Sequence, residues 1–407
     1  MTTSTILSPP STQTRRTPSP LRVVEDVSQK DFSPLLRPEN FHPIPPNTIP
    51  SPFLSGLNAP SQEASLQDLL KSGHFYAAAI KAAQELVSLT APYDPTRIFN
   101  LLHTRLSCLQ LISQTPLAAA ESKVLGDLTN AFYRDPLTDA HIVPWDFRVL
   151  LVRLQALGFG DWRRGIMTYY ALGAEARMEL GRAGLDGRAR DAGLWRWRLT
   201  DLGIRVASAL VEMGDAEGAG RHLRSLELEG DGDAEGIRRI VMMEALVWLR
   251  LGDLRAARRC VARFKIATTE ATSPRDELAT GDEPGEEDDI SFRTLSALLH
   301  IAAGDFHTAV SEWRALHEQF PSDATIQQNL AVCLIYTGHM SEAKQLLETL
   351  VDVDTTPAFQ ALLFNLCTVY ELCTGRANEA KAHLVERVAA KSPSESGWEK
   401  ASIEFKL

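Results

Sequence analysis

A glycine followed five residues later by an alanine recurs five times in the second half of this sequence. Apolar residues lie at three- and four-residue steps on both sides of each glycine, which is the periodicity of amphipathic helices. Glycine supplies the left-handed conformation that a tight turn between two helices requires. Each copy therefore predicts a helical hairpin. The copies are LVEMGDAEGAGRHL (210–223), WLRLGDLRAARRCV (248–261), HIAAGDFHTAVSEW (300–313), LIYTGHMSEAKQLL (334–347) and YELCTGRANEAKAHL (370–384).

The small and large residues of each copy have separate structural roles. An alanine after the turn allows the two helix axes to approach to about 8–10 Å. A larger residue one helical turn later, such as Trp313 or Leu347, is expected to pack into the neighbouring hairpin. The turn glycines are Gly214, Gly252, Gly304, Gly338 and Gly375, and the alanines are Ala219, Ala257, Ala309, Ala343 and Ala380.

The spacing of the turn glycines indicates the class of repeat. Consecutive glycines lie 38, 52, 34 and 37 residues apart, and a helix–turn–helix period of 34 residues is typical of tetratricopeptide repeats. The long interval contains residues 270–289, which include nine acidic residues and one arginine. We interpret this stretch as a solvated surface loop, because lengthening a loop costs only about 1 kcal/mol or less. An acidic partner-binding segment is the alternative.

The sequence divides into three parts. Residues 1–61 are expected to form a disordered leader, because this part holds 12 of the 22 prolines and many serines and threonines. Residues 62–199 predict irregular helical hairpins, with weaker copies of the turn at Gly73 and Gly160. Residues 200–407 predict tetratricopeptide-like repeats. The predicted fold class is all-α, a tetratricopeptide-like α-solenoid of stacked helical hairpins.

A concave groove is the usual contact surface of such an array, and the first helix of each hairpin lines it. In the last repeats, Gln328, Tyr336 and Asn365 are expected to lie on that face. We interpret them as candidate partner-binding residues. The alternative is that they are ordinary solvated positions.

Patterns for catalysis, metals or cofactors are lacking in the sequence. The ten histidines are scattered and the five cysteines form no CxxC pair, so zinc-ligand spacing is absent. GFGDWRRG (158–165) lacks the lysine and the serine or threonine of a phosphate-binding loop. We therefore expect no catalytic residues, no metal, no cofactor and no enzyme activity. The cysteines are interpreted as small core residues.

Charge and hydropathy disfavour two further classes of partner. The formal net charge of −10 disfavours general binding to nucleic acid or to anionic membranes. Trp195 and Trp197 alternate with Arg196 and Arg198, and such pairs stack on RNA bases in some proteins. We prefer the interpretation that one of these tryptophans belongs to the core. No run of about 18 apolar residues predicts a membrane-spanning helix.

Four blocks of the sequence resemble the family of subunit 12 of the transport protein particle (TRAPP) complex. The two most specific are NLAVCLIYTGHMSEAKQLLETLV (329–351) and LLFNLCTVYEL (362–372). The other two are LWRWRL (194–199) and VPWDFRVLLVRL (143–154). The blocks occur in the family's order over about 140–372. The proline-rich leader, the acidic stretch and the residues after about 376 depart from the family, as expected of a short version of it.

The resemblance implies a non-catalytic scaffold or adaptor subunit of a TRAPP-type tethering and Rab-activating complex. Such a complex acts in ER-to-Golgi vesicle traffic and in autophagy. The implied partners are other TRAPP subunits, with indirect association with membranes and a Rab GTPase, no nucleic acid and no direct lipid anchor. The implied location is cytoplasmic, peripheral to early secretory membranes at the ER–Golgi interface and the Golgi.

Three other functions stay open at this point. One is a stand-alone tetratricopeptide adaptor or co-chaperone that binds peptides, although the positions of a carboxylate clamp are mostly neutral. The second is an enzyme with a site in the N-terminal half, and the third is RNA binding through the Trp/Arg helix. The clamp positions are Thr294, Leu298, Asn329, Leu362 and Leu366, of which Asn329 alone fits.

Overall fold

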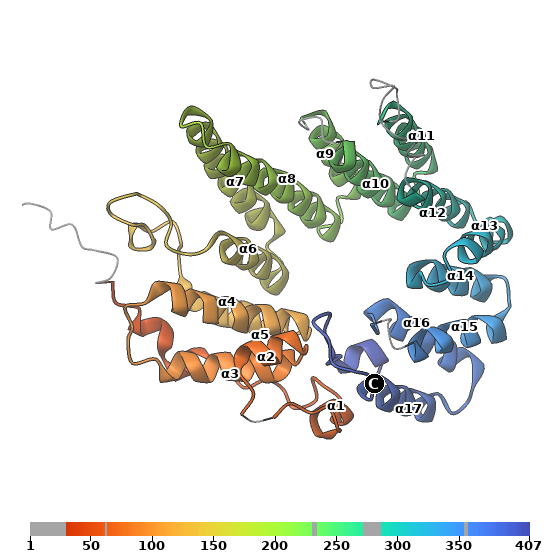
Figure 1. Cartoon of the computed structure of the whole chain (residues 1–407), viewed down its shortest axis with the longest axis horizontal. Coiled ribbons are helices and arrows are strands. Elements are labelled where there is room, and N and C mark those ends of the chain that lie inside the picture. Colours follow the sequence, from red (N-terminus) through yellow and green to blue (C-terminus); the bar gives the residue numbers. More distant parts are fainter. Residues whose placement is uncertain (1–29, 62, 230–233, 272–285, 354–356) are drawn as a thin grey trace, which may run out of the picture.

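The computed structural model describes residues 30–61, 63–229, 234–271, 286–353 and 357–407. Within these ranges every named element is a helix, either α or a short 3-10 turn, and the helices follow one another as hairpins (Figure 1). The prediction of an all-α array of stacked hairpins is therefore confirmed. A short α1 (Ser51–Ser55) precedes the array. The hairpins are α2 (Leu66–Lys71) with α3 (Phe75–Ser88), α4 (Pro95–Leu111) with α5 (Thr115–Ser122), α6 (Trp145–Phe159) with α7 (Trp162–Leu185), α8 (Ala189–Glu212) with α9 (Ala216–Glu229), α10 (Ala234–Leu251) with α11 (Leu254–Ala271), α12 (Glu286–Ala302) with α13 (Phe306–Gln319), α14 (Ala324–Tyr336) with α15 (Met340–Asp352), and α16 (Gln360–Cys373) with α17 (Ala377–Ala389).

The turns within the hairpins follow from the glycine pattern. Gly338 has a φ of 84°, and its N–H donates to the carbonyl of Ile335 at the end of α14. Gly375 does not adopt a positive φ; here α16 ends at Cys373 and the extended Thr374, with a φ of −145°, follows it. The other repeat glycines with a positive φ are Gly214, Gly252 and Gly304.

Small and large residues alternate in the core of the repeats. Trp313 is fully buried on α13, and Leu347 is fully buried on α15. The alanine of the last copy, Ala380, is half-buried on α17. The other four alanines leave no surface exposed, which places two helices in close contact at each of them. They are Ala219, Ala257, Ala309 and Ala343.

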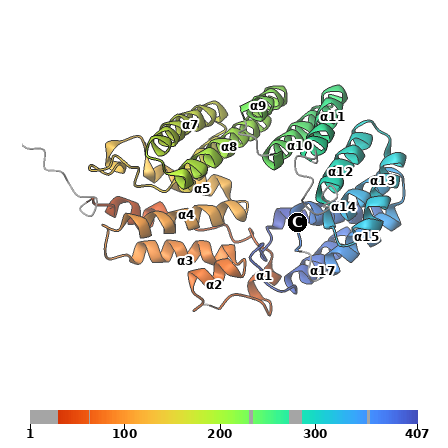
Figure 2. The ribbon, with the colours of Figure 1, turned by 45° about the horizontal axis from the view of Figure 1, so that its top comes forward.

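The array curves until its two ends meet. Figure 1 shows α17 and the C-terminus returning to α1 and α2, and Figure 2 shows the same approach from another side. The ring of Phe53 in α1 packs edge-on against Trp398, with ring centroids 5.1 Å apart. The N–H of Ser402 donates to the carbonyl of Thr48 at 3.0 Å. A single hydrophobic core therefore contains residues from both ends of the chain.

The predicted disordered leader differs from the structure at residues 30–61. Residues 1–29 lie outside the described residues. From Lys30 onward the segment packs against α4 and the C-terminal residues, with Phe32 1% exposed and Phe53 fully buried. The prolines indicated disorder, but apolar residues lie between them. Burial of these residues offsets the entropy of ordering the segment. The buried apolar residues are Phe32, Leu35, Leu36, Ile44, Ile49 and Phe53.

Two other predicted boundaries differ from the structure. The predicted acidic loop spans residues 270–289, but in the structure α11 continues to Ala271 and α12 begins at Glu286. The central residues, 272–285, lie outside the described residues. The boundary between residues 199 and 200 falls inside α8, where Leu199 and Leu202 share one hydrophobic cluster. The irregular part and the regular repeats therefore form a continuous array.

Candidate partner-binding surface

The predicted groove residues lie on the first helices α14 and α16. Tyr336 is 66% exposed at the end of α14, and its ring stacks on Phe306 of the preceding hairpin with centroids 4.5 Å apart. Gln328 is half-buried, and its Oε1 atom has no hydrogen-bond partner. Asn365 is half-buried on α16. Tyr336 is thus the most accessible of the three candidates.

The C-terminal residues cover part of α16. Lys406 follows a 3-10 turn, and its Nζ atom lies 4.3 Å from the ring centroid of Phe364. The same Nζ donates to Thr368 Oγ1 at 2.7 Å and to Glu371 Oε2 at 3.1 Å. Lys381 also donates to Glu371, and these two hydrogen bonds lower the pKa of the Glu371 carboxyl. The chain therefore occupies part of this helix with its own C-terminal residues.

The buried carboxylate of Glu399 joins the C-terminal residues to the start of α3. Glu399 accepts a hydrogen bond from the N–H of Tyr76, in the first turn of α3, at 2.6 Å. His74 Nδ1 lies 3.7 Å from the other carboxylate oxygen, and both side chains are buried. A carboxylate at a helix N-terminus is stabilised by the free N–H groups there. Glu399 therefore caps a helix more than 300 residues away in the sequence.

A second buried ion pair fixes the segment before α1. The side chains of Arg105 in α4 and Glu121 in α5 are each 2% exposed and form two hydrogen bonds, at 3.0 and 2.7 Å. Arg105 also donates to the carbonyls of His42 and Ala79. The N–H of His42 donates back to Glu121 at 2.9 Å. The pair thus connects α4 and α5 to α3 and to the segment before α1.

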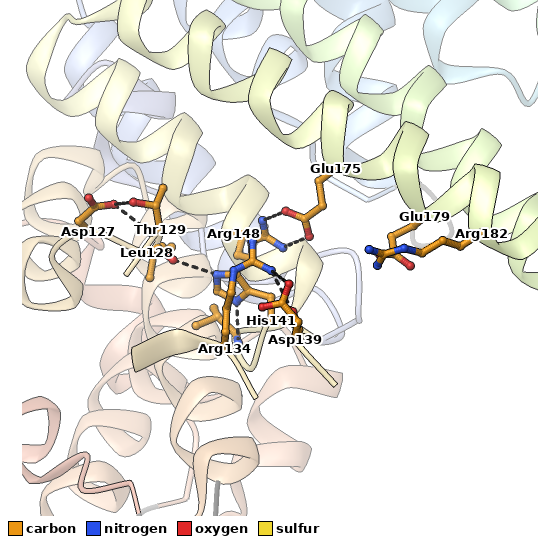
Figure 3. A network of polar contacts seen from close by, with 11 residues as sticks. Asp127, Leu128, Thr129, Arg134, Asp139, His141, Arg148, Glu175, Glu179 and Arg182 are labelled. Atoms are coloured by element: carbon orange, nitrogen blue, oxygen red, sulfur yellow. Dashed lines mark hydrogen bonds and ion pairs between the residues drawn. The ribbon is translucent and has the colours of Figure 1, made fainter. Parts of the chain in front are cut away.

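A polar network joins the loop after α5 to α6 and α7 (Figure 3). Arg148 on α6 forms two hydrogen bonds with Glu175 on α7, at 2.8 and 2.6 Å. His141 in the loop contacts the carbonyl of Leu128 through Nε2 at 3.1 Å, and its Nδ1 accepts from the N–H of Val143. Nε2 is therefore the donor, and the ring is neutral in this arrangement.

Burial and the charge of Arg148 together set the pKa values of His141 and Glu175. Burial lowers the pKa of His141 to about 4, and the nearby positive charge of Arg148 acts in the same direction. Burial alone would raise the pKa of Glu175, but its hydrogen bonds to Arg148 and the charge of that arginine outweigh this effect and lower it. The network is therefore a neutral histidine beside a charged pair.

The tryptophans singled out by the sequence separate into one packed and one exposed residue. Trp195 packs edge-on against Trp145 of α6, with centroids 5.4 Å apart. The guanidinium of Arg198 lies 4.4 Å from the ring centroid of Trp195 and 5.0 Å from that of Trp145. Trp197 is 58% exposed. Arg198 is thus stacked within the protein.

The cysteines of the described residues are free thiols. Cys373 is exposed, which differs from its interpretation as a core residue, because it ends α16. Burial raises the pKa of Cys108 to about 12 and those of Cys333 and Cys367 to about 11. These thiols stay protonated at neutral pH and are poor nucleophiles.

The described part of the chain offers neither a metal site nor a membrane-spanning helix. No group of three or more histidine, cysteine, aspartate or glutamate side chains there is arranged to bind a metal. No helix in the same part is long and apolar enough to cross a bilayer.

Comparisons with known proteins agree with this architecture. A family model described as a tetratricopeptide repeat matches residues 300–366, from α12 to α16. Human trafficking protein particle complex subunit 12 is 28% identical over 211 residues, which is 51% of this chain and 26% of the human protein. The chain thus contains a tetratricopeptide-repeat region and is similar to TRAPP subunit 12. The resemblance predicted from the sequence blocks is therefore confirmed.

The extent of the similarity to TRAPP subunit 12 is limited. The mouse protein is 26% identical over 211 residues, covering 51% of this chain and 24% of the mouse protein. The match thus spans about a quarter of the length of these relatives.

A crystal structure of a tetratricopeptide repeat protein from Parabacteroides merdae aligns with 71% of this chain and 90% of its own, at 13% identity and a TM-score of 0.36.

Proposed function

We propose that this chain is a non-catalytic scaffold subunit of a TRAPP-type tethering and Rab-activating complex that acts in ER-to-Golgi traffic. The observation that carries the proposal is the similarity over 211 residues to TRAPP subunit 12. In this role the chain binds other subunits and reaches membranes and a Rab GTPase through them. Its place is then the cytoplasmic face of early secretory membranes, and a part in autophagy belongs to the same proposal.

The array of hairpins supports a role in binding proteins. Stacked repeats present an extended surface whose exposed side chains serve as contacts, and aromatic residues supply much of the binding energy at such surfaces. Tyr336 is the exposed aromatic residue at the end of α14. We propose that it contacts a partner subunit, with Gln328 and Asn365 contributing polar contacts.

Affinity purification of the tagged full-length chain followed by mass spectrometry tests the proposed function. Joint recovery of several small and large TRAPP subunits is the expected result. A set of recovered proteins dominated by chaperones would instead support the peptide-binding adaptor and contradict the proposal.

The groove is tested by Tyr336→Ala in the same experiment. Loss of the aromatic contact is expected to weaken recovery of at least one subunit by about fivefold or more, as truncation of a central contact residue costs over 1 kcal/mol. Tyr93→Ala is the matched control, because Tyr93 is 51% exposed in the turn before α4. Equal recovery with both variants would remove Tyr336 from the contact surface.

A further inference from the structure

The outer face of α7 exposes an apolar stripe of a kind that is uncommon on the outside of a helical array. Met167 is 68% exposed, Met178 59% and Leu185 91%, and Tyr170 is also exposed. All four lie on one helix of 24 residues. Contiguous exposed apolar surface of this kind marks a site of interaction.

Helical periodicity places these residues on one face. Met167, Tyr170, Met178 and Leu185 follow one another at steps that keep them within about 80° of one another around the helix at 100° per residue. Positions 171, 174 and 181 on the same face are alanine or glycine, so small residues separate the large ones along the stripe. The stripe is about 30 Å long at 1.5 Å per residue. The opposite face is buried against α6 and α8 through Tyr169, Leu172, Ala176 and Ala183.

The position of α7 leaves the stripe accessible. In Figures 1 and 2, α7 lies at the edge of the array, and α8 separates it from α9. Its main contacts are with α8 and, less extensively, with α6. The stripe is therefore an unpartnered face in the described part of the chain.

Arginines border the stripe. We name the stripe together with Arg163, Arg164, Arg177 and Arg182 the α7 surface. Among the residues that the structure describes, Arg163, Arg164 and Arg177 have no ion-pair partner. Of the carboxylates nearby, Glu175 pairs with Arg148 and Glu179 with Arg182, and Asp161 accepts a hydrogen bond from the backbone N–H of Arg164 at the start of the helix. This surface is positive although the whole chain carries a net charge of −10.

We propose that the α7 surface docks an amphipathic helix of another protein, with an apolar face that fills the stripe and acidic residues that meet the bordering arginines. The small residues of the stripe let a partner helix approach closely, and the methionines adapt to its side chains. Complementary charge fixes orientation and speeds association. The inference rests on the proposed function, since it assigns one face of the scaffold to one kind of partner segment.

Two other occupants fit the α7 surface less well. A second copy would bring two arginine-bearing surfaces of the same sign together, and facing like charges are destabilising. An anionic bilayer favours an apolar face of large residues such as tryptophan, phenylalanine and leucine, but alanine and glycine interrupt this face at positions 171, 174 and 181. The net charge of −10 also opposes approach to an anionic surface.

The test uses the full-length chain with a photo-crosslinking amino acid in place of Ala174. We expect the crosslinked segment, sequenced by mass spectrometry, to be an acidic amphipathic helix. Binding of that purified protein is then measured for Met167→Glu/Met178→Glu, which is expected to bind about tenfold or more weakly, because the new carboxylates lose their water against the apolar face of the partner helix. Leu111→Glu is the matched control, since Leu111 is 58% exposed at the end of α4. Circular dichroism verifies the fold of both variants.

The outcomes separate this inference from the proposed function. If the chain recovers TRAPP subunits and the double variant recovers all of them equally well, the docking inference is wrong while the proposed function stands. If no TRAPP subunit is recovered but Ala174 crosslinks to an acidic helix of another protein, the proposed function is wrong while the docking inference stands. A crosslink to a second copy, or flotation with phosphatidylserine vesicles that the double variant abolishes, would overturn the docking inference.

Discussion

Ala343 shows how much one side chain contributes to this fold. It is fully buried on α15, next to α14, where Ala331 is also fully buried. Two small residues at a helix contact keep the axes close, and well-packed interiors leave little room for extra atoms. The sequence identified Ala343 as a position of close approach from its spacing to Gly338.

Replacing Ala343 with tryptophan is expected to lower the free energy of unfolding by about 1–3 kcal/mol, because the larger side chain overpacks the hairpin. Urea denaturation measures the change. Ser341→Trp is the control, since Ser341 is exposed two residues earlier in the same helix. An unchanged unfolding midpoint for Ala343→Trp would contradict the assignment of this alanine to the helix contact.

The neutral His141 makes stability depend on pH. Its pKa is lowered from 6.5 to about 4, so between these values the unfolded chain binds more protons than the folded one. The stabilising effect is fully present above about pH 6.5 and is lost as the pH falls toward about 4. The lowered pKa of Glu175 adds a loss at more acidic pH, below its unfolded value of 4.5.

The His141→Gln variant is expected to lose less stability than the native chain when the pH falls from about 7 to about 5, because glutamine does not titrate. Urea denaturation at the two pH values measures this difference. Identical pH dependence in the two proteins would show that His141 is not the group responsible.

At the scale of elements, the α4–α5 turn shows where the glycine pattern stops being informative. Ser113 occupies the turn with a φ of 62°, and its N–H donates to the carbonyl of Gln110, as Gly338 does to Ile335. The turn is thus the same, although a non-glycine residue occupies it. The sequence predicted helices here but not the repeat, because tertiary packing compensates for a strained residue.

The buried pair between α4 and α5 is expected to matter more than exposed pairs. Glu121→Gln leaves the buried charge of Arg105 without its carboxylate, which is expected to cost about 3–5 kcal/mol of unfolding free energy. Glu217→Gln removes one partner of the exposed Arg221–Glu217 pair on α9, for which the expected change is below about 1 kcal/mol. Chemical denaturation compares them, and equal effects would contradict a structural role for the buried pair.

At the scale of the whole molecule, contacts between its two ends close the array. The carbonyl of Gly73 accepts from the N–H groups of Trp398 and Glu399, each at 3.4 Å. A Cβ atom on Gly73 would overlap backbone atoms of Ser394 and Trp398. Gly73 therefore serves as a turn residue and as a point of close approach of the C-terminal residues.

The closure predicts different effects for two glycines with the same conformation. Gly73 and Gly160 have φ values of 71° and 69°, but a Cβ on Gly160 meets nothing within 4 Å. Alanine at either position is expected to cost about 1–2 kcal/mol from the left-handed backbone alone. Only Gly73→Ala is expected also to speed hydrogen–deuterium exchange of residues 394–407. Exchange that is equally slow in both variants would contradict the close approach.

The sequence alone determined the hairpins, their turns and their small contact residues, because these depend on neighbours within about 40 residues and leave a periodic pattern. It also placed Tyr336 at an exposed position. The tertiary structure alone decided that residues 30–61 are ordered and that the two ends of the array meet. Both depend on contacts such as Phe53 with Trp398, which lie far apart in the sequence and leave no local pattern. It also decided that the apolar stripe of α7 faces outward, since helical spacing identifies a face without showing what covers it.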